Sequence, residues 1–439
     1  MSLITIIARI KATTTWVIRG VVVFFIYLAF KSFLPHHLVP STTVALIEPS
    51  VGKNAVDASF ARVAFEIAFE SLNQEAGLLQ GKVDVFEVGK EIESEADAAN
   101  IRKQLIDNDV EAIFGCATSA CVRLIVPIAD ELEIPFFYVR PHEGLISSRY
   151  AFFLGPLPNQ GIVPAIRWAM ERYGSRVHIT GSNGLYSRIL GGMVRHEVVA
   201  AGGSITGEHY YGADEDTISG LPEAWNTDTT DLVINLAVNN TLISLMKLES
   251  VVVAGLRRPP QILASLDAAL IADVGRYTVV DHYIIASYLQ EFEAGLTGEF
   301  NQLWISRMGA SVPFGVAEVS AFLAVRLWST ALRKTLTRDP VDVVNMLSNV
   351  HVDTGGAFGK VSFERNHHYL DHRLFVLKIL DGDEFKLVSS GREPVKPVVY
   401  PVSNPKQYWI ELLEQLRRDT ADTWVFENTA VVKPAGSRG

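Results

Sequence analysis

Short apolar runs alternate with longer amphipathic stretches along most of this chain, starting at Thr43. The run at 44–47 is typical of a strand, whereas apolar positions between Phe60 and Leu72 recur at the spacing of one helical face. Over residues 43–138 strands and helices alternate, which predicts a parallel sheet covered by helices on both faces. The predicted strands are 44–47, 83–88, 112–114 and 135–138, and the predicted helices are 60–72, 96–106 and 119–132.

The same rhythm repeats after residue 150 and predicts a second α/β lobe. Two long helical stretches, at 289–296 and 316–334, then precede a β-rich end. Polar and turn-forming residues dominate 403–439 around one helical piece at 408–416, and we expect an appendage there. The remaining predicted strands are 151–154, 177–180, 204–210, 231–235, 261–264, 279–285, 359–363, 373–380 and 384–388, and the remaining predicted helices are the one ending at 173, 185–201 and 241–254.

The N-terminal segment carries an export signal. An apolar stretch at 16–34 contains two charges, Arg19 and Lys31, whose long side chains can snorkel to the membrane surface. The absence of a clear small-x-small cleavage site favours an uncleaved anchor over a cleaved signal peptide. In both cases a hydrophobic helix within 1–40 precedes the body, and residues 35–439 lie outside the cytoplasm. Anchoring would make the membrane a partner.

Length and charge narrow the class of protein. At roughly 100–200 residues per domain, 439 residues predict two or three domains. Lys+Arg 39 against Asp+Glu 49 gives a net charge of -10 and no basic stripe, so we expect no nucleic-acid partner.

Cys116 and Cys121 are the only cysteines, so no cysteine follows the apolar segment closely enough to carry a lipid anchor. The two lie where a strand ends and a helix begins, an awkward spacing for a disulfide. We expect two buried free thiols, with a disulfide as the alternative because the compartment is oxidising.

The chain lacks the motifs of the common catalytic sites. There is no phosphate-binding P-loop and no nucleophile elbow, and His196-Glu197 lacks the second histidine of a zinc protease helix. His367, His368 and His372 form the one histidine cluster, but in a turn-rich stretch solvated or hydrogen-bonded histidines are more common than metal ligands. We therefore predict no enzyme activity, no metal and no cofactor.

Several short motifs together resemble the amide/urea-binding branch of the class I periplasmic binding proteins. This branch includes solute receptors of branched-chain amino acid type ABC importers and cytoplasmic amide sensors. Each motif is weak alone, but their order and spacing over 41–400 resemble the family. The motifs are Gly115-Cys116-x-x-Ser119 with Pro127, Tyr138-x-x-Pro141-x-Glu143-Gly144, Gly155-Pro-x-Pro158-Asn159-Gln160, Gly181-Ser182-x-x-x-Tyr186-x-Arg188, Gly202-Gly203 with Glu208, and Asn366-His367-His368 with Arg373.

The resemblance implies an α/β fold of two Rossmann-like lobes with parallel sheets, joined by three crossovers around a ligand cleft. The crossovers are expected near 156–160, 284–288 and 355–359. The expected units are 1–40 as the N-terminal segment, 41–157 plus 287–356 as lobe 1, 158–286 plus 357–402 as lobe 2, and 403–439 as the C-terminal extension.

The resemblance also carries ligand-binding roles to particular residues. Thr118 and Ser119 start a helix that faces the cleft, and the Ser119 hydroxyl matches one that binds the ligand; a plain helix cap is the alternative for Ser119. Tyr138 and Tyr186 match aromatic walls of the pocket, and ordinary packing is their alternative. Tyr283 is a weaker candidate.

Several residues differ from the family pattern, so the resemblance does not determine the identity of the ligand. Ala117 replaces a bulky residue, Arg140 and His142 replace neutral and aromatic residues, and Asn239 with its neighbour Asn240 replaces small ones. Asp267 also departs. Arg140 would suit a carboxylate or phosphate if it faces the cleft.

Two charged residues near the cleft have structural alternatives. Arg140 either points to solvent or pairs with Glu143 if it binds no anion. An ion pair between Glu143 and Arg188 is a further structural possibility.

Three functions follow from these observations. The first is a solute receptor that closes on a small polar ligand, such as an amide, urea, amino acid or small carboxylate, and presents it to an ABC permease or a membrane sensor. The second is a protein-interaction module that has lost its ligand. The third and weakest is an amidohydrolase using Ser119 with His142 as its base.

Overall fold

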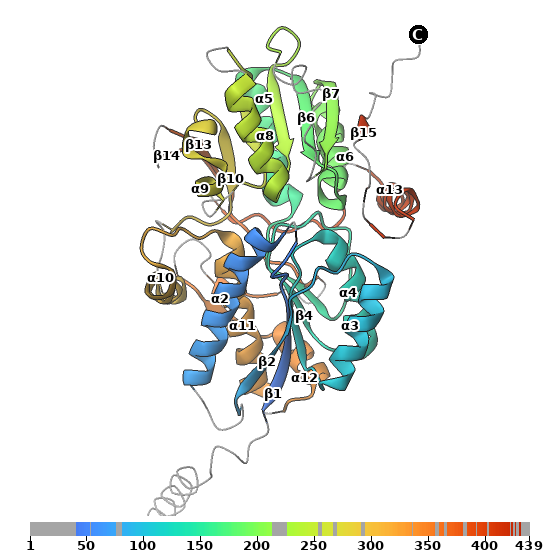
Figure 1. Ribbon diagram of the computed structural model, residues 1–439, viewed down its shortest axis with the longest axis vertical. Coiled ribbons are helices and arrows are strands. Elements are labelled where there is room, and N and C mark those ends of the chain that lie inside the picture. The colour runs from blue at the N-terminus through green and yellow to red at the C-terminus, as the bar shows by residue number, and fades with distance from the viewer. Residues whose placement is uncertain are drawn as a thin grey trace, which may run out of the picture.

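The computed structural model describes residues 41–431, except 53, 76–80, 213–225, 253–256, 267–269, 291–294, 336, 356–359, 364–366, 381–383, 392, 402–403, 422, 425 and 427–429. Two α/β lobes lie one above the other, and each is built on its own sheet (Figure 1). The expected N-terminal helix, Asp267 and Asn366 lie outside the described residues. Among the described residues no helix is long and apolar enough to cross a bilayer.

The first sheet has five parallel strands in the order β2-β1-β3-β4-β5. A stack of phenylalanines runs across its middle, with ring centroids 4.9 Å apart between Phe114 and Phe137 and 5.3 Å between Phe137 and Phe152. The strands are β1 (Thr42–Ile47), β2 (Val83–Val88), β3 (Ala112–Gly115), β4 (Phe136–Tyr138) and β5 (Ala151–Phe153).

Helices cover this first sheet, and their apolar sides form one core with it. α11 is buried along most of its length, with Trp328 edge-on to Phe114 at 5.8 Å. The helices are α2 (Ala55–Gln74), α3 (Glu95–Asp107), α4 (Ser119–Leu132), α10 (Gly295–Met308), α11 (Val316–Thr335) and α12 (Pro340–Leu347).

The second sheet is mixed, with the order β14-β13-β10-β9-β8-β6-β7-β15. Its five central strands are parallel, but β13, β14 and β15 pair antiparallel because β13 and β14 form a hairpin and β15 returns from the C-terminus. The strands are β6 (Arg176–Ser182), β7 (Ser204–Tyr211), β8 (Leu232–Leu236), β9 (Gln261–Leu263), β10 (Tyr283–Ala286), β13 (Phe375–Ile379), β14 (Phe385–Ser390) and β15 (Ala430–Val431).

The second lobe also has helices on its sheet, and α13 packs on the outer side of α6 (Figure 1). Its elements are η2 (Pro158–Gln160), α5 (Ile162–Tyr173), α6 (Leu185–Ala200), α8 (Asn239–Val252), α9 (Ile271–Val274), η3 (Arg276–Thr278) and α13 (Lys406–Asp419). A small hairpin of β11 (Val352–Asp353) and β12 (Lys360–Val361) lies outside both sheets.

The chain changes lobe after β5 and after β10, close to the first two expected crossovers. Phe363, Tyr369 and Leu370 still pack in the core of the first lobe, and Phe375 starts β13 in the second sheet. We therefore place the third crossover after Leu370 instead of near 355–359.

The structure confirms the predicted α/β fold of two lobes with parallel sheets. α10 and α12 are among the helices that differ from the prediction. α10 starts at Gly295 and runs past the expected end at 296, and its buried residues are spaced as Thr297, Phe300 and Trp304 among polar neighbours, a weak apolar pattern. α12 was not predicted, although Asp339 caps it and Pro340 starts it, which are ordinary start signals.

Candidate functional site

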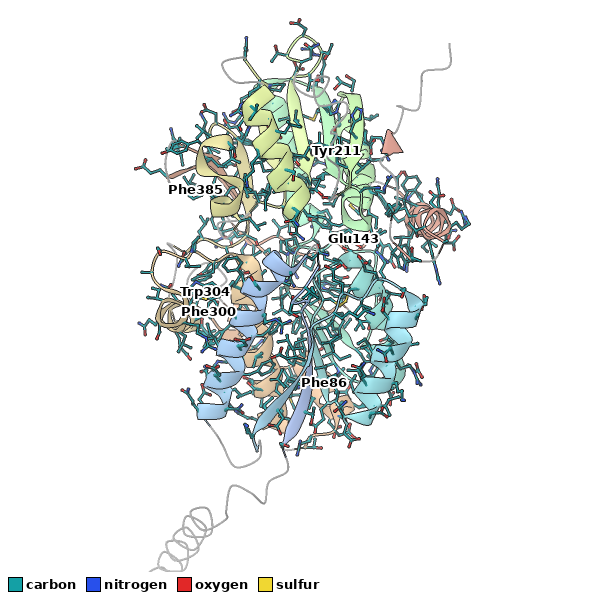
Figure 2. All side chains as sticks on the ribbon, in the orientation of Figure 1. Phe86, Glu143, Tyr211, Phe300, Trp304 and Phe385 are labelled. Atoms are coloured by element: carbon teal, nitrogen blue, oxygen red, sulfur yellow. A yellow bond between two sulfur atoms is a disulfide. The ribbon has the colours of Figure 1, made fainter. Side chains whose placement is uncertain are left out.

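A cavity of about 470 Å³ lies between the two lobes. The segments that follow β3 and β4 line it from the first lobe, and those that follow β6, β8 and β9 line it from the second. The carboxyl ends of parallel strands and the amino ends of helices therefore meet at one crevice, as in other open α/β sheets. Figure 2 places Glu143 at this junction.

Six of the eight predicted ligand-binding residues line this cavity together. Ser119 and Tyr186, which belong to opposite lobes, both line this cavity. The six are Thr118, Ser119, Tyr138, Arg140, Tyr186 and Asn239. Whether they contact a ligand stays a prediction.

The first-lobe wall begins with a tight turn after β3. Gly115 has φ +109°, and a Cβ there would lie 2.5 Å from the Ile47 carbonyl oxygen, so only glycine fits. Cys116 follows with φ +72°, and its N–H donates to the same oxygen at 2.7 Å. Two successive positive φ angles turn the chain sharply.

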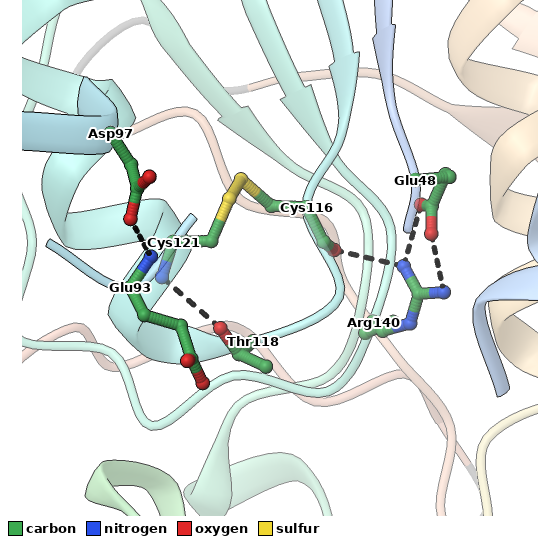
Figure 3. The surroundings of a disulfide bond; sticks show 7 residues. All are labelled: Glu48, Glu93, Asp97, Cys116, Thr118, Cys121 and Arg140. Atoms are coloured by element: carbon green, nitrogen blue, oxygen red, sulfur yellow. Dashed lines mark hydrogen bonds and ion pairs between the residues drawn. A yellow bond between two sulfur atoms is a disulfide. The ribbon is translucent and has the colours of Figure 1, made fainter. Parts of the chain in front are cut away.

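This turn overturns the expectation of free thiols. Cys116 and Cys121 form a disulfide, with their Cα atoms 5.7 Å apart (Figure 3). A spacing of five residues is unsuitable for a disulfide if a regular strand ends at Cys116. The left-handed backbone at Cys116 instead folds the chain back, which brings the two cysteines within disulfide range. Both cysteines are buried, and the closed loop carries Thr118 and Ser119.

Thr118 and Ser119 have different hydrogen-bonding capacity toward a ligand. The Thr118 Oγ1 caps α4 by accepting from the Cys121 N–H at 3.1 Å, which leaves the hydroxyl hydrogen to donate. The Ser119 Oγ donates its one hydrogen to Glu143 Oε2 at 2.6 Å. Toward a ligand Ser119 is therefore an acceptor of N–H or O–H groups.

Glu143 is fully buried, and it pairs with Arg123 at 3.0 Å. The expected ion pair with Arg188 is wrong, because Arg188 binds the side chain of Asn183 instead. Burial alone would raise the pKa of Glu143, but the positive charge of Arg123 and the hydrogen bond from Ser119 act in the opposite direction, and the pKa is lowered. Glu143 is thus a buried carboxylate and a weak base.

His142 is buried beside this carboxylate, and burial lowers its pKa to about 4 against the opposing charge of Glu143. Its Nδ1 accepts the Gly144 N–H at 3.0 Å, so the neutral ring carries its proton on Nε2. Nε2 lies 3.6 Å from Glu143 Oε2, beyond a hydrogen bond. Because Ser119 bonds Glu143, the geometry shows no Ser119–His142 pair of the kind a hydrolase needs.

Arg140 lines the cavity, but its guanidinium binds Glu48 through two hydrogen bonds of 2.8 and 2.9 Å (Figure 3). A third bond of 2.9 Å goes to the Cys116 carbonyl oxygen. The expected alternatives, solvent or a pair with Glu143, are both wrong, because the end of β1 supplies a buried carboxylate that the sequence spacing did not connect to Arg140. The pair carries no net charge.

The second-lobe wall combines an aromatic ring with small polar groups. Tyr186 is half-buried at the start of α6, and burial together with the charge of Glu143 raises its pKa, so its phenol stays protonated and can donate. Ser265 follows β9 and lines the cavity, and its hydroxyl acts on Tyr186 in the direction that lowers the tyrosine pKa, against the larger effect of burial. Ser265 was not among the predicted residues, although a polar residue close after a strand of this kind is a usable signal.

Asn239 bridges the lobes. Its Nδ2 donates to the Oδ1 of Asn54 at 2.8 Å, and the backbone N–H of Asn54 donates to Glu91 Oε1 at 2.9 Å. Asn239 also has φ +49°, a conformation that asparagine tolerates better than most residues. Asn54 had not been predicted, since only the fold brings it opposite Asn239.

Two predicted residues lie elsewhere. His142 lines a second cavity of about 340 Å³ on the hinge side, which shares Tyr186 with the first. Tyr283 joins neither cavity lining; its hydroxyl bonds that of Tyr173, and its ring packs edge-on against Trp168 at 5.2 Å. Among the residues the structure describes, no three His, Cys, Asp or Glu side chains are grouped to hold a metal.

The sequence profile of the Periplasmic binding protein domain family matches residues 43–406. The chain belongs to the periplasmic binding protein family. Its fold is of class I. Family membership implies an extracytoplasmic location for the two-lobed body.

Solved structures with this fold include several transporter receptors. An amino acid ABC transporter substrate-binding protein from Pseudomonas fluorescens Pf-5 has a TM-score of 0.68 and 15% identity, over 84% of this chain and 99% of that one. A solute-binding protein from R. palustris, solved with benzoate, has a TM-score of 0.69 and 14% identity, over 82% and 98%. The branched-chain amino acid binding protein LivJ from Streptococcus pneumoniae, solved with isoleucine, has a TM-score of 0.67 and 14% identity, over 82% and 100%.

Proposed function

We propose that this periplasmic binding protein is a solute receptor that captures a small polar ligand in the interlobe cavity and closes around it. Ser119 and Tyr186, which face one cavity from opposite lobes, carry this proposal. Its volume of about 470 Å³ falls within the range of small-molecule sites. Only a closed form satisfies groups on both walls, so ligand binding favours closure.

The polarity of the wall favours neutral or zwitterionic ligands over simple anions. Arg140, on the cavity wall, pairs with the buried carboxylate of Glu48, and Arg123, behind the wall, pairs with that of Glu143. Thr118 and Tyr186 offer donors, and Ser119 offers an acceptor. An amide, a urea or an amino acid presents both N–H and oxygen groups that match this set.

The proposed partner is an ABC permease or a membrane sensor that recognises the closed form; this is supported by the fold, which the chain shares with ABC transporter substrate-binding proteins. Ligand capture involves no bond breaking. The hydrogen bond from Ser119 to a carboxylate of lowered pKa supports this, because such a carboxylate is a poor base for a serine nucleophile.

The test is a thermal-shift and calorimetric screen of the body with acetamide, urea, L-leucine, L-isoleucine and benzoate. A ligand at 100 times its Kd adds about 2.7 kcal/mol to stability. We expect a response to at least one neutral or zwitterionic compound, reduced in Tyr186→Ala. No response to any class would contradict the receptor proposal and favour the interaction module, and turnover of an amide that disappears in Ser119→Ala would favour the hydrolase.

A further inference from the structure

The C-terminal extension is attached to the second lobe at two points. α13 packs on α6, and Trp409 is fully buried there with its Nε1 donating to the Pro401 carbonyl oxygen at 3.0 Å. Further along, β15 pairs antiparallel with the edge strand β7. We call the described residues of 406–431 the C-terminal strap. The family profile matches residues 43–406, so this segment lies beyond the matched part of the chain except for its first residue.

Two aromatic residues of the strap, Trp424 and Phe426, line the interlobe cavity between these attachments. The Phe426 ring lies 4.5 Å from the Arg188 guanidinium carbon, and its carbonyl oxygen accepts from Asn183 Nδ2 at 3.3 Å. Asn183 and Arg188 both belong to the second lobe, so Phe426 is held on that side of the cavity.

Trp424 reaches the first lobe. The guanidinium carbon of Arg123, on α4, lies 5.7 Å from the centre of the Trp424 ring, within the range of a cation–π contact. Trp424 also packs against the apolar cores of both lobes. Its φ of +58° is unusual for a bulky residue, and a bond from its N–H to Thr420 Oγ1 at 3.1 Å helps to hold it.

The Trp424 contact leads directly to the polar wall of the cavity. Arg123, which faces Trp424, binds Glu143 at 3.0 Å, and Glu143 accepts from Ser119 at 2.6 Å. The strap therefore touches Arg123, which binds the carboxylate that positions the predicted ligand-binding serine.

We propose that the C-terminal strap completes the binding site: Trp424 and Phe426 contact a flat apolar part of the solute, and the Trp424–Arg123 contact helps hold the lobes closed around it. Together with Tyr138, Tyr186 and Tyr211 the strap gives the cavity five aromatic side chains. The faces of these aromatic rings fit a planar group of the ligand, and a small number of polar atoms in the lining fixes the orientation of that group. The ligand class is a neutral or zwitterionic solute with an aryl or similar planar group, an inference that rests on the receptor function.

The binding test compares matched probes, benzamide against acetamide and L-phenylalanine against L-alanine, by calorimetry and stopped-flow on the full body. In at least one pair the wild type binds the aryl probe at least tenfold more tightly. Trp424→Ala removes most of this preference and raises the dissociation rate, whereas Trp424→Phe retains it. Tyr408→Ala is the control, since Tyr408 lies on α13 with 42% of its surface exposed and outside the cavity. Equal binding of aryl and small probes, or wild-type affinity in Trp424→Ala, overturns the proposal.

A ligand-independent measurement separates failure of the strap from failure of the receptor function. Amide hydrogen exchange of the unliganded protein reports on α4, which carries Arg123. Trp424→Ala accelerates exchange in 119–132 and increases the radius of gyration, and Tyr408→Ala does neither. If no probe binds the wild type, the receptor function fails on that panel; if exchange and size are also unchanged in Trp424→Ala, the strap proposal fails as well.

Discussion

Arg140 and Glu48 form a bidentate ion pair on the wall of the cleft, with Nη1–Oε1 and Nη2–Oε2 distances of 2.8 and 2.9 Å. Glu48 is completely buried and Arg140 is 6% exposed. A pair in this geometry compensates its own charges, whereas either partner alone would be an uncompensated charge in a medium of low dielectric. The pair also ties the end of β1 to the segment after β4.

Removing the arginine should therefore destabilise the fold. Arg140→Ala leaves the Glu48 carboxylate buried and unpaired, and we expect a loss of about 3–5 kcal/mol in the free energy of unfolding, measured by urea denaturation. Arg102→Ala is the control, because the pair of Arg102 with Glu131 is exposed and such pairs contribute less than about 1 kcal/mol. A loss in Arg140→Ala no larger than in Arg102→Ala would contradict the buried-pair interpretation.

Opening the disulfide should loosen the loop that presents Thr118 and Ser119. The bond closes a loop over a sequence separation of 5, for which the chain-entropy relation gives about 2 kcal/mol. We expect the double variant Cys116→Ala/Cys121→Ala to lose stability of that order, in urea unfolding, and to exchange the amides of 117–120 faster. Two reactive thiols in the denatured, unreduced wild type would show that the bond is absent.

The order of elements could be predicted from the sequence because apolar periodicity reports local structure. The cavity was located for the same reason: Ser119 and Tyr186 each follow a strand, and parallel strands bring such positions to one crevice. The partners of charged residues could not be predicted, because the pairing of Arg140 with Glu48 joins residues 92 positions apart. The disulfide was only the alternative to free thiols, because it depends on the left-handed backbone at Cys116, which the sequence does not reveal.

The contribution of Trp424 was missed for a related reason. The segment around Trp424 carries no periodic pattern of apolar residues that would predict its structure. Only the path of the folded chain brings Trp424 to the cavity. Tyr283 illustrates the opposite error: it lies in the strand that enters a crossover, but its side chain packs against Trp168 and Tyr173.

The Asn54–Asn239 hydrogen bond should favour the closed arrangement, because it is made between the lobes at a distance of 2.8 Å. Asn239→Ala removes it. A neutral hydrogen bond contributes about 1 kcal/mol, so we expect a ligand identified by the screen to bind about fivefold more weakly. Calorimetry measures this, and Asn349→Ala, an exposed position outside the cavity, is the control. Unchanged affinity in Asn239→Ala would contradict a role for this bond in closure.

Acid should destabilise the protein well before its carboxylates are protonated. Burial lowers the pKa of four histidines, to about 4 for His142, His368 and His372 and to about 3 for His178. Below pH ~6.5 these histidines are protonated in the unfolded chain, but in the folded chain they stay neutral until about pH 4. The free energy of unfolding is therefore highest above pH ~6.5 and falls as the pH is lowered from there. Four such groups give a slope of at most about 5 kcal/mol per pH unit.

Urea unfolding at a series of pH values from 7.5 to 4.5 measures this slope. His372→Gln should reduce the excess of protons bound on unfolding by close to one, because it removes one group that titrates only in the unfolded chain. The matched surface control is His351→Gln, at an exposed position. If the free energy of unfolding stays flat between pH 6.5 and 5, or if His372→Gln and the wild type have the same slope, the buried histidines do not account for acid sensitivity.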